Sequence, residues 1–279
     1  MEEIISLDIG GTNTRCALVD SSYEVKAIKI NPTVTGTLQG FLDSVAAIIK
    51  EVAPNPKVAK AIAIGVPGRV RYDGYIYALP NIHIEAIPLA AYLHDLFKMP
   101  VYVKNDAEVA ALAESNVGPY KIYKSLYFIT ISTGVGGALC VDGKLRNSSY
   151  EVGHTLMECH GEIHEAEHML SGAYLTRLAK ANGVDIKDAH EFFNLVKAKD
   201  PKIMPTYEDW IKLLSQFIQM NQDNFQPDIF TLTGGVMKSA DIFFEDLRKA
   251  CPHSHLEKCA FDQEAGLIGA AVYGFQQTK

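Results

Sequence analysis

The sequence predicts an α/β protein built from two similar domains that face a shared cleft. A length of 279 residues and a hydrophobic fraction of 48% are sufficient for two domains of ordinary globular composition. A glycine-rich turn joins two apolar segments at residues 4–20, and the same layout returns at residues 126–142. Because two matched glycine turns are much harder to explain by chance than one, we expect a duplicated core.

Composition limits the classes of function that the chain can perform. The formal net charge is −7 and no segment is rich in Lys or Arg, so we expect no nucleic-acid partner. The sequence contains no signal peptide and no apolar run of about 18 residues, which predicts a cytoplasmic protein without a membrane partner. Five widely spaced cysteines, an odd number, are typical of reduced thiols rather than of a disulfide framework.

The first half of the chain alternates predicted strands with amphipathic helices. Residues 25–30 are typical of a strand, and Thr37 can cap a helix over 38–52. Residues 59–66 form an apolar run suited to a strand buried on both faces, and this run ends at a turn around Gly68. Three further elements are predicted: a helix over 89–97, a strand over 100–103 and a helix over 107–115.

The second half begins with the second glycine turn and then becomes mainly helical. A strand over 228–232 leads into a third glycine-rich turn at Gly234 and Gly235, followed by a helix from about residue 238. A final helix over 263–276 carries small residues suited to close packing. The other predicted helices cover residues 170–181, 187–197 and 206–224.

The first glycine turn is typical of a phosphate-binding loop. Paired glycines allow backbone amides to approach an anion closely, and Thr12 adds a hydroxyl. Asp8 places a carboxylate beside this turn, which is consistent with a divalent cation bridging the carboxylate and phosphate oxygens. The alternative is an ordinary hairpin turn with no ligand.

Five motifs follow one another along the chain. They are Asp8-Ile9-Gly10-Gly11-Thr12-x-x-Arg15, Asn105-Asp106, Ser132-Thr133-Gly134-x-Gly136-Gly137, Glu151-Val152-Gly153-His154 and Leu232-Thr233-Gly234-Gly235-Val236. This order is typical of ROK sugar kinases. The chain therefore resembles bacterial glucokinase, allose kinase and N-acetylmannosamine kinase, which belong to the actin/hexokinase superfamily.

This resemblance implies a two-domain actin-like ATPase fold, related to ribonuclease H, with a duplicated core and an interdomain cleft. The N-terminal α/β domain would contain residues 1–117, and the C-terminal domain residues 118–262. The helix over 263–279 would pack back onto the N-terminal domain. The resemblance also implies a homodimer.

The resemblance further implies transfer of phosphate from ATP to a hexose or N-acetylhexosamine, at the 6-hydroxyl. Asp106 would be the general base, a role that agrees with the need for a carboxylate near the attacking hydroxyl; the alternative is a helix cap beside Asn105. Sugar contacts would come from Gly68, Asn81, Asn105, Asp106, Glu151, His154 and Glu167. ATP contacts would come from Gly10, Gly11, Thr12, Asn13, Arg15, Thr133, Gly134, Gly234 and Gly235, with Asp8 orienting Mg²⁺.

The sequence departs from the family pattern in the segment that follows His154. Most members carry a zinc module, Cys-x-Cys-Gly-x-x-Gly-Cys-x-Glu, but its three cysteine positions are here Glu158, His160 and Glu165. At most His154, Cys159, His160 and His164 remain as zinc ligands. We therefore expect the loop to be stabilised by packing, without a structural zinc.

Two other classes of function remain as alternatives. The first is a catalytically silent sugar sensor of the same family. A repressor of the family type, which carries a helix-turn-helix domain before the first hairpin, is not expected, because only Met1 to Ile5 precede that hairpin here. The second is a zinc hydrolase using His164-Glu165-x-x-His168, which would leave both glycine turns unexplained. The sequence leaves open which sugar is used among glucose, mannose, allose, fructose and N-acetylmannosamine.

Overall fold

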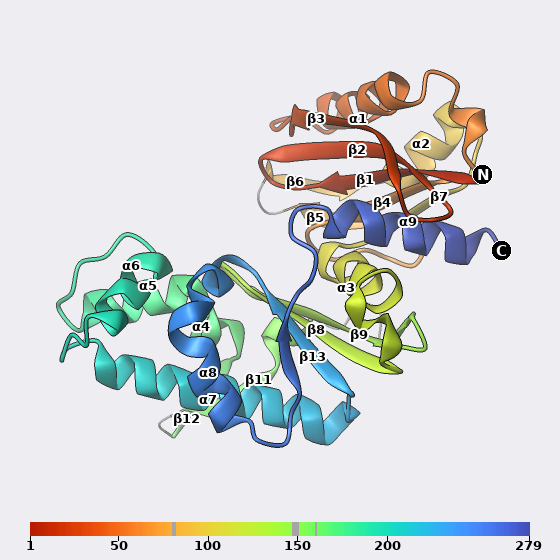
Figure 1. Cartoon of the computed structure of the whole chain (residues 1–279). Coiled ribbons are helices and arrows are strands. Elements are labelled where there is room, and N and C mark those ends of the chain that lie inside the picture. The colour runs from red at the N-terminus through yellow and green to blue at the C-terminus, as the bar shows by residue number, and fades with distance from the viewer. Residues whose placement is uncertain (80–81, 147–150, 160) are drawn as a thin grey trace. The chain divides into compact units, whose positions relative to one another are not determined.

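The computed structural model describes residues 1–79, 82–146, 151–159 and 161–279 (Figure 1). The predicted sugar contact Asn81 and the predicted zinc ligand His160 lie outside the described residues. The chain divides into two compact units. Unit 1 contains Met1–Ile122, Gly143–Ser149 and Ala260–Lys279, and unit 2 contains Tyr123–Asp142 and Tyr150–Cys259.

Unit 1 is built on a five-stranded sheet of order β3-β2-β1-β4-β7. The strand β2 is antiparallel to both β1 and β3, whereas β4 is parallel to β1, and β7 is parallel to β4. A separate antiparallel pair, β5 and β6, was not predicted from the sequence. The strands are β1 (Glu3–Ile9), β2 (Asn13–Asp20), β3 (Val25–Pro32), β4 (Ile62–Val66), β5 (Ile76–Leu79), β6 (Ile84–Ile87) and β7 (Val101–Asn105).

Helices cover both faces of this sheet. Successive side chains along a strand point to opposite faces, so neighbouring apolar residues of one strand pack against different helices. Ile5 and Leu7 pack in a core with residues of α1 and α2, whereas Ile4 packs in a second core with residues of α3 and α9. Figure 1 shows α1 and α9 on opposite sides of the sheet. The helices of unit 1 are α1 (Leu38–Val52), α2 (Leu89–Phe97), α3 (Asp106–Asn116) and α9 (Ala265–Gln277), with short 3-10 turns at Pro56–Val58 and Pro119–Ile122.

Local sequence signals explain where several of these helices begin and pack. The side chain of Thr37 accepts a hydrogen bond from the Gly40 amide at 3.2 Å, as predicted for the cap of α1. A Cβ on Gly269 would lie 1.6 Å from the Val109 carbonyl oxygen. The small residues of α9 are therefore needed where this helix crosses α3.

Unit 2 repeats the central strand pattern of unit 1, which confirms the predicted duplicated core. The strand β8 is antiparallel to β9 and parallel to β13, just as β1 is antiparallel to β2 and parallel to β4. The strands of unit 2 in this sheet follow the order β9-β8-β13-β14. They are β8 (Ser125–Ile131), β9 (Val135–Val141), β13 (Ile229–Thr233) and β14 (Leu256–Lys258), whereas the short strand β10 (Lys144–Arg146) belongs to unit 1.

The helices of unit 2 pack around a cluster of aromatic side chains. The ring of Phe193 lies 5.0 Å from that of Phe243 and 5.4 Å from that of Trp210, measured between centroids. The buried Trp210 indole donates a hydrogen bond to the Leu170 carbonyl at 3.0 Å. The helices are α4 (Glu167–Leu170), α5 (Gly172–Ala181), α6 (Ala189–Lys197), α7 (Met204–Phe225) and α8 (Ala240–Ala250), with 3-10 turns η4 (Val152–His154) and η5 (Gly235–Ser239).

Two features of unit 2 correct the sequence prediction. The helix predicted over 170–181 is divided at Ser171, which caps α5 and is followed by the Gly172 amide that donates to the Ser132 carbonyl at 2.8 Å. Helical periodicity alone does not reveal this interruption, because it depends on a distant loop. An antiparallel hairpin of β11 (Leu156–Cys159) and β12 (Glu162–Glu165) was also not predicted.

The described part of the chain contains no helix that is both long and apolar enough to span a membrane.

Candidate functional site

In unit 1, Asp8 and Arg15 face each other across the first hairpin. The strand register pairs them directly, and the Arg15 Nη1 lies 3.1 Å from the Asp8 Oδ2. A Cβ on Gly266 would lie 2.6 Å from the Asp8 Cγ, so the first turn of α9 covers this carboxylate closely. Burial raises the pKa of Asp8, and the charge and hydrogen bond of Arg15 offset this effect only in part.

This environment fits the divalent cation that the sequence predicts. Burial makes the ionised form of a carboxyl group unfavourable, and additional positive charge nearby stabilises that ionised form. Magnesium is commonly held by one or two carboxylates together with phosphate oxygens. Asp8 would be the protein ligand for such an ion.

The glycine turn beside Asp8 is fixed at its base and exposed at its tip. The Gly10 amide donates to the Asn13 carbonyl at 2.9 Å, and the Thr33 hydroxyl donates to the Gly10 carbonyl at 2.7 Å. Thr12, at the tip, is exposed. A rigid turn with an open tip is suited to contacts between backbone and phosphate.

Asn105 and Asp106 divide two tasks at the start of α3. The Asn105 Oδ1 accepts a hydrogen bond from the Ala107 amide at 2.9 Å, so Asn105 is the helix cap. Its Nδ2 donates to the carbonyl of Gly68 at 3.0 Å, which links β7 to the turn after β4. Asp106 is the first residue of the helix and is exposed. The Asp106 Oδ1 also accepts a hydrogen bond from the Ala107 amide, at 2.8 Å, so Asn105 is the cap and Asp106 shares one of its donors.

In unit 2, Ser132 connects three loops. Its amide donates to the Gly134 carbonyl, its carbonyl accepts from the Gly172 amide, and its hydroxyl accepts from the Gly235 amide, each at 2.8 Å. The second glycine turn, the start of α5 and the turn after β13 are therefore held together. The sequence motif contained Ser132, but its role depends on contacts between segments far apart in the chain.

Thr133 and Gly235 line a cavity of about 720 Å³ that lies entirely in unit 2. Its walls also contain four cationic side chains that the sequence analysis missed, because they belong to no motif. They are Arg177, Lys180, Lys187 and Lys238. Within the described residues, the ion-pair partners of Lys180 and Lys187 are the exposed Asp185 at 3.8 Å and the half-buried Glu191 at 3.6 Å.

Glu167, the first residue of α4, packs tightly against Gly134 and Gly153. Its Oε2 accepts a hydrogen bond from the Val135 amide at 3.3 Å. A Cβ on Gly134 would lie 2.4 Å from this oxygen, and a Cβ on Gly153 would lie 3.2 Å from the Glu167 Cβ. Glycine is required at position 153, because a Cβ there would also lie 2.3 Å from the Val135 carbonyl oxygen. Glu151, another predicted sugar contact, precedes η4 and is half-buried.

His154 is exposed and pairs with Glu165 at the end of β12. The His154 Nδ1 lies 3.0 Å from the Glu165 Oε2, and this hydrogen bond is the main reason that the pKa of His154 is raised. His154, Glu165 and Glu167 each place one ligand atom within 4.8 Å of the others. The structure thus groups one imidazole with two carboxylates.

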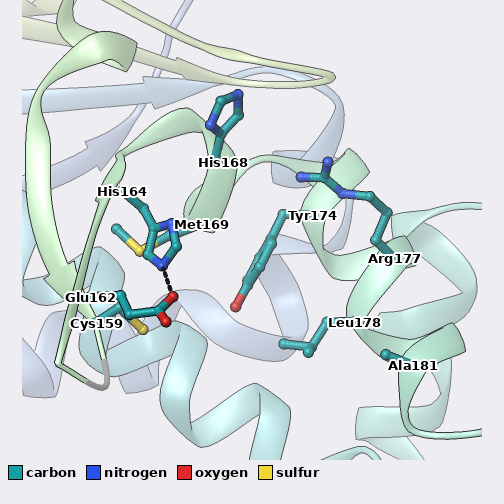
Figure 2. Close-up of a pocket in the computed structure, with 9 residues that line it drawn as sticks. All are labelled: Cys159, Glu162, His164, His168, Met169, Tyr174, Arg177, Leu178 and Ala181. Carbon is teal, nitrogen blue, oxygen red and sulfur yellow. Dashed lines mark ion pairs between the residues drawn. The ribbon is translucent and has the colours of Figure 1, made fainter.

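The predicted zinc ligands do not converge in the described part of the structure. In the β11–β12 hairpin, Cys159 and His164 point to one face, whereas Glu165 points to the other, because side chains alternate along each strand. Figure 2 shows Cys159 and His164 lining a cavity of about 640 Å³ together with Arg177. A four-ligand zinc site with thiolates does not fit this arrangement.

The zinc hydrolase alternative also lacks its required geometry. That motif needs two histidines one turn apart on a single helix. Here His164 belongs to β12 and His168 belongs to α4, and Glu165 between them pairs with His154. The spacing in the sequence is therefore accidental.

Comparison with known proteins identifies the family. The ROK family model matches residues 4–276. The chain belongs to the ROK family. This confirms the resemblance that the motifs predicted.

Three relatives show how far the ROK similarity extends. A glucokinase of Streptomyces coelicolor is 27% identical over 305 residues, which cover 96% of each chain. An N-acetylmannosamine kinase of Escherichia coli O127:H6 is 34% identical over 167 residues, covering 57% of this chain and 56% of the relative. The crystal structure of a ROK hexokinase from Thermus thermophilus superposes with a TM-score of 0.89 at 26% identity, covering 99% of this chain and 98% of the other. The predicted fold class is therefore confirmed.

Proposed function

We propose that this ROK sugar kinase transfers the γ-phosphate of ATP to the 6-hydroxyl of a hexose or N-acetylhexosamine, with Asp106 as general base. ATP-dependent sugar kinase activity is supported by the family match and by relatives named glucokinase and N-acetylmannosamine kinase. The proposed roles of Asp106, of the sugar contacts and of the phosphate contacts are argued from the site residues.

The observation that carries the assignment of Asp106 is the division of tasks at the start of α3. Asn105 is the helix cap, and the Asp106 Oδ1 accepts a further hydrogen bond from the same Ala107 amide at 2.8 Å, which fixes this carboxylate at the first, exposed position of the helix. Asn105 also bonds to Gly68, another predicted sugar contact. One rigid corner of unit 1 therefore holds three predicted sugar contacts: Gly68, Asn105 and Asp106.

In the proposed reaction, the Asp106 carboxylate accepts the proton of the sugar hydroxyl while the hydroxyl oxygen attacks the γ-phosphorus. The bond from this phosphorus to the bridging oxygen breaks, and ADP leaves. Phosphoryl transfer depends mainly on positioning and charge neutralisation, so one well-placed carboxylate is sufficient as base. Mg²⁺ held by Asp8 would neutralise charge on the phosphates.

The donor half of the reaction is assigned to the loops around Ser132. Thr133 and Gly235 line the cationic cavity of unit 2, and the positive side chains of α5 and η5 balance the charge of a triphosphate. Within unit 1, Arg15 and the glycine turn of residues 10–13 are the proposed phosphate contacts.

The test is Asp106→Asn, which preserves side-chain shape but removes the proton acceptor. We expect turnover to fall by at least about 100-fold, while ATP binding measured by calorimetry stays within about two-fold of the wild type. The matched control is Asp241→Asn, because Asp241 is likewise an exposed carboxylate in the first turn of a helix, α8. Near-normal turnover of Asp106→Asn would refute the general-base assignment.

Substrate identity is tested by ADP release from the wild type with a panel of hexoses and N-acetylhexosamines. We expect one group of sugars to be phosphorylated with a clearly higher kcat/KM. Absence of ADP release with every sugar, combined with measurable sugar binding, would favour the silent sensor.

A further inference from the structure

We propose that the β11–β12 hairpin holds His154 by a direct hydrogen bond that the His154 Nδ1 donates to Glu165, in place of a metal ion, and that this bond selects the Nδ1-protonated form of His154. The inference rests on the proposed function in one respect, namely that His154 contacts the sugar.

The first step concerns the positions where the resemblance expects zinc thiolates. Two of the three, residues 158 and 165, are glutamates in this sequence, and the third lies outside the described residues. The two glutamates lie on the same face of the hairpin, since Glu158 is opposite Ile163 and Glu165 is opposite Leu156. Both carboxylates are already engaged in hydrogen bonds.

Glu158 closes the tip of the hairpin. Its Oε1 accepts a hydrogen bond from the Gly161 amide at 2.6 Å, and Gly161 has a φ of +84°, a backbone conformation that favours glycine. A side chain bonded across the turn keeps the two strands in register. A bound metal ion would otherwise hold the two strands together in this way.

Glu165 performs the second task, which is to orient His154. Its Oε2 lies 3.0 Å from the His154 Nδ1, and the same oxygen lies 3.9 Å from the His168 Nδ1. Because an ionised carboxylate can only accept hydrogen bonds, the His154 Nδ1 must carry the proton. In the neutral imidazole, Nε2 is then an acceptor.

This arrangement has a consequence for sugar recognition. If a metal ion occupied Nδ1, the neutral ring would carry its proton on Nε2 and would donate a hydrogen bond from there. With Glu165 on Nδ1, a neutral His154 accepts a hydrogen bond at Nε2, so a sugar hydroxyl must donate to it. Glu165 is therefore a positioning residue. It determines that the neutral His154 accepts, rather than donates, the hydrogen bond with the sugar hydroxyl.

The alternative interpretation is a cation bound by His154, Glu165 and Glu167. Their ligand atoms lie within 4.8 Å of one another, which is close enough to share one ion. The experiment must therefore compare a direct hydrogen bond with a metal bridge. It uses the full-length protein and three readouts, of which two do not depend on activity.

The first readout is nitrogen NMR of the His154 ring at alkaline pH, where the imidazole is neutral. The chain has nine histidines, so the signals are assigned with His154→Asn. We expect the Nδ1-protonated form in the wild type and the Nε2-protonated form in Glu165→Ala. The matched control is Glu162→Ala on the opposite face of the hairpin, where Glu162 pairs with His164 at 3.4 Å, and it should leave His154 unchanged.

The second readout is metal content, together with Tm before and after treatment with a zinc chelator. We expect far less than one zinc per chain and no change in Tm or in the His154 signals. Stoichiometric metal whose removal shifts those signals would overturn the proposal, as would a wild type with the proton on Nε2.

The third readout separates KM from kcat. We expect Glu165→Ala to raise the KM for the sugar by about 10-fold or more, with a smaller change in kcat and in the KM for ATP. We expect a smaller rise in the sugar KM for Glu165→Gln, because its amide oxygen still accepts a hydrogen bond from His154. An unchanged KM in Glu165→Ala would refute the role in sugar binding. If the wild type releases no ADP with any sugar, the proposed function fails, whereas NMR and metal analysis still decide the role of Glu165.

Discussion

At the scale of single residues, Asp20 shows how one carboxylate organises a turn. It is buried at the end of β2, and its Oδ1 accepts hydrogen bonds from the Ser22 hydroxyl at 2.6 Å, the Ser22 amide at 2.9 Å and the Glu24 amide at 3.0 Å. The Lys26 ammonium lies 3.1 Å from Oδ2. The Ser22 hydroxyl, followed by these other donors, holds the pKa of Asp20 well below its usual value.

This depressed pKa predicts a pH-dependent contribution to stability. A carboxyl group whose pKa is lower in the folded state stabilises the fold above its unfolded pKa of about 3.9, and the contribution is lost as pH falls toward the folded pKa. We therefore expect Asp20→Asn to lower Tm at neutral pH, with the difference from wild type shrinking as pH falls below about 4.

Differential scanning fluorimetry across this range checks the prediction. Asp95→Asn is the control, because Asp95 is exposed and its ion pair with Lys98 is a surface contact of 3.8 Å. The same Tm deficit for Asp20→Asn at acidic and neutral pH would contradict the argument.

At the scale of secondary structure, the turn between β13 and η5 requires glycine for two separate reasons. Gly234 has a φ of +104°, which L side chains rarely adopt, and a Cβ there would lie 2.3 Å from the Ile131 carbonyl oxygen at the end of β8. The turn can therefore press against β8 and present the Gly235 amide to Ser132. This is why glycine is needed at position 234, where the strand becomes a helical turn.

Gly234→Ala should displace this turn and weaken the binding of ATP. We expect the KM for ATP to rise by about 10-fold or more. Both the backbone strain and the collision of the new Cβ with β8 act on the loop that contains Gly235, which lines the cationic cavity of unit 2. Steady-state kinetics with ATP as the varied substrate, together with Tm, measure the effect.

Gly183→Ala is the matched control, because Gly183 also has a positive φ of +75° but a Cβ there would meet nothing within 4 Å. We expect this variant to lower Tm slightly and to leave the KM for ATP unchanged. Equal effects of the two substitutions on this KM would mean that the collision with β8 is unimportant.

At the scale of the whole molecule, the chain enters unit 1 three times, and it returns there for the last time at Ala260. Glu114 in α3 holds the returning segment. Its two carboxylate oxygens accept hydrogen bonds from the Ala260 amide at 3.1 Å and the Phe261 amide at 3.0 Å, and its side chain is fully buried. The returning chain then enters α9, which packs on α3 and on the sheet of unit 1.

Removal of this anchor should destabilise unit 1. In Glu114→Ala, two backbone amides lose their acceptor in a buried place, at a cost of about 1–3 kcal/mol. We expect a fall of several degrees in Tm, measured by scanning calorimetry. The control Glu264→Ala removes an exposed glutamate just before α9 and should leave Tm nearly unchanged.

The sequence predicted those parts of the site that depend on local patterns. The turn at Gly10 and Gly11, the cap and carboxylate at Asn105 and Asp106, and the glycine pair at Gly234 are each recognisable within a few residues. The cations Arg177 and Lys180 were missed because a helix surface with positive charge has no distinctive local pattern. Their relevance appears only once α5 is placed beside the turn that contains Ser132.

The residues named as the most that could remain for zinc show the limit of reading a short segment locally. Cys159, His164 and His154 are neighbours in the sequence. The hairpin register sends Cys159 and His164 to one face and Glu165 to the other, where it meets His154. The unpredicted pairing of β11 with β12 therefore decides which of these side chains lie together.

By itself, the sequence determined the duplicated α/β core, the glycine turns and the family of this protein. These follow from periods of two and 3.6 residues and from the conformational freedom of glycine, which are local properties of the chain. Only the tertiary structure decided which side chains meet: Ser132 with Gly235, Glu114 with the returning chain, and Glu165 with His154. Such contacts depend on strand register and on the packing of distant segments, and no short stretch of sequence specifies either of them.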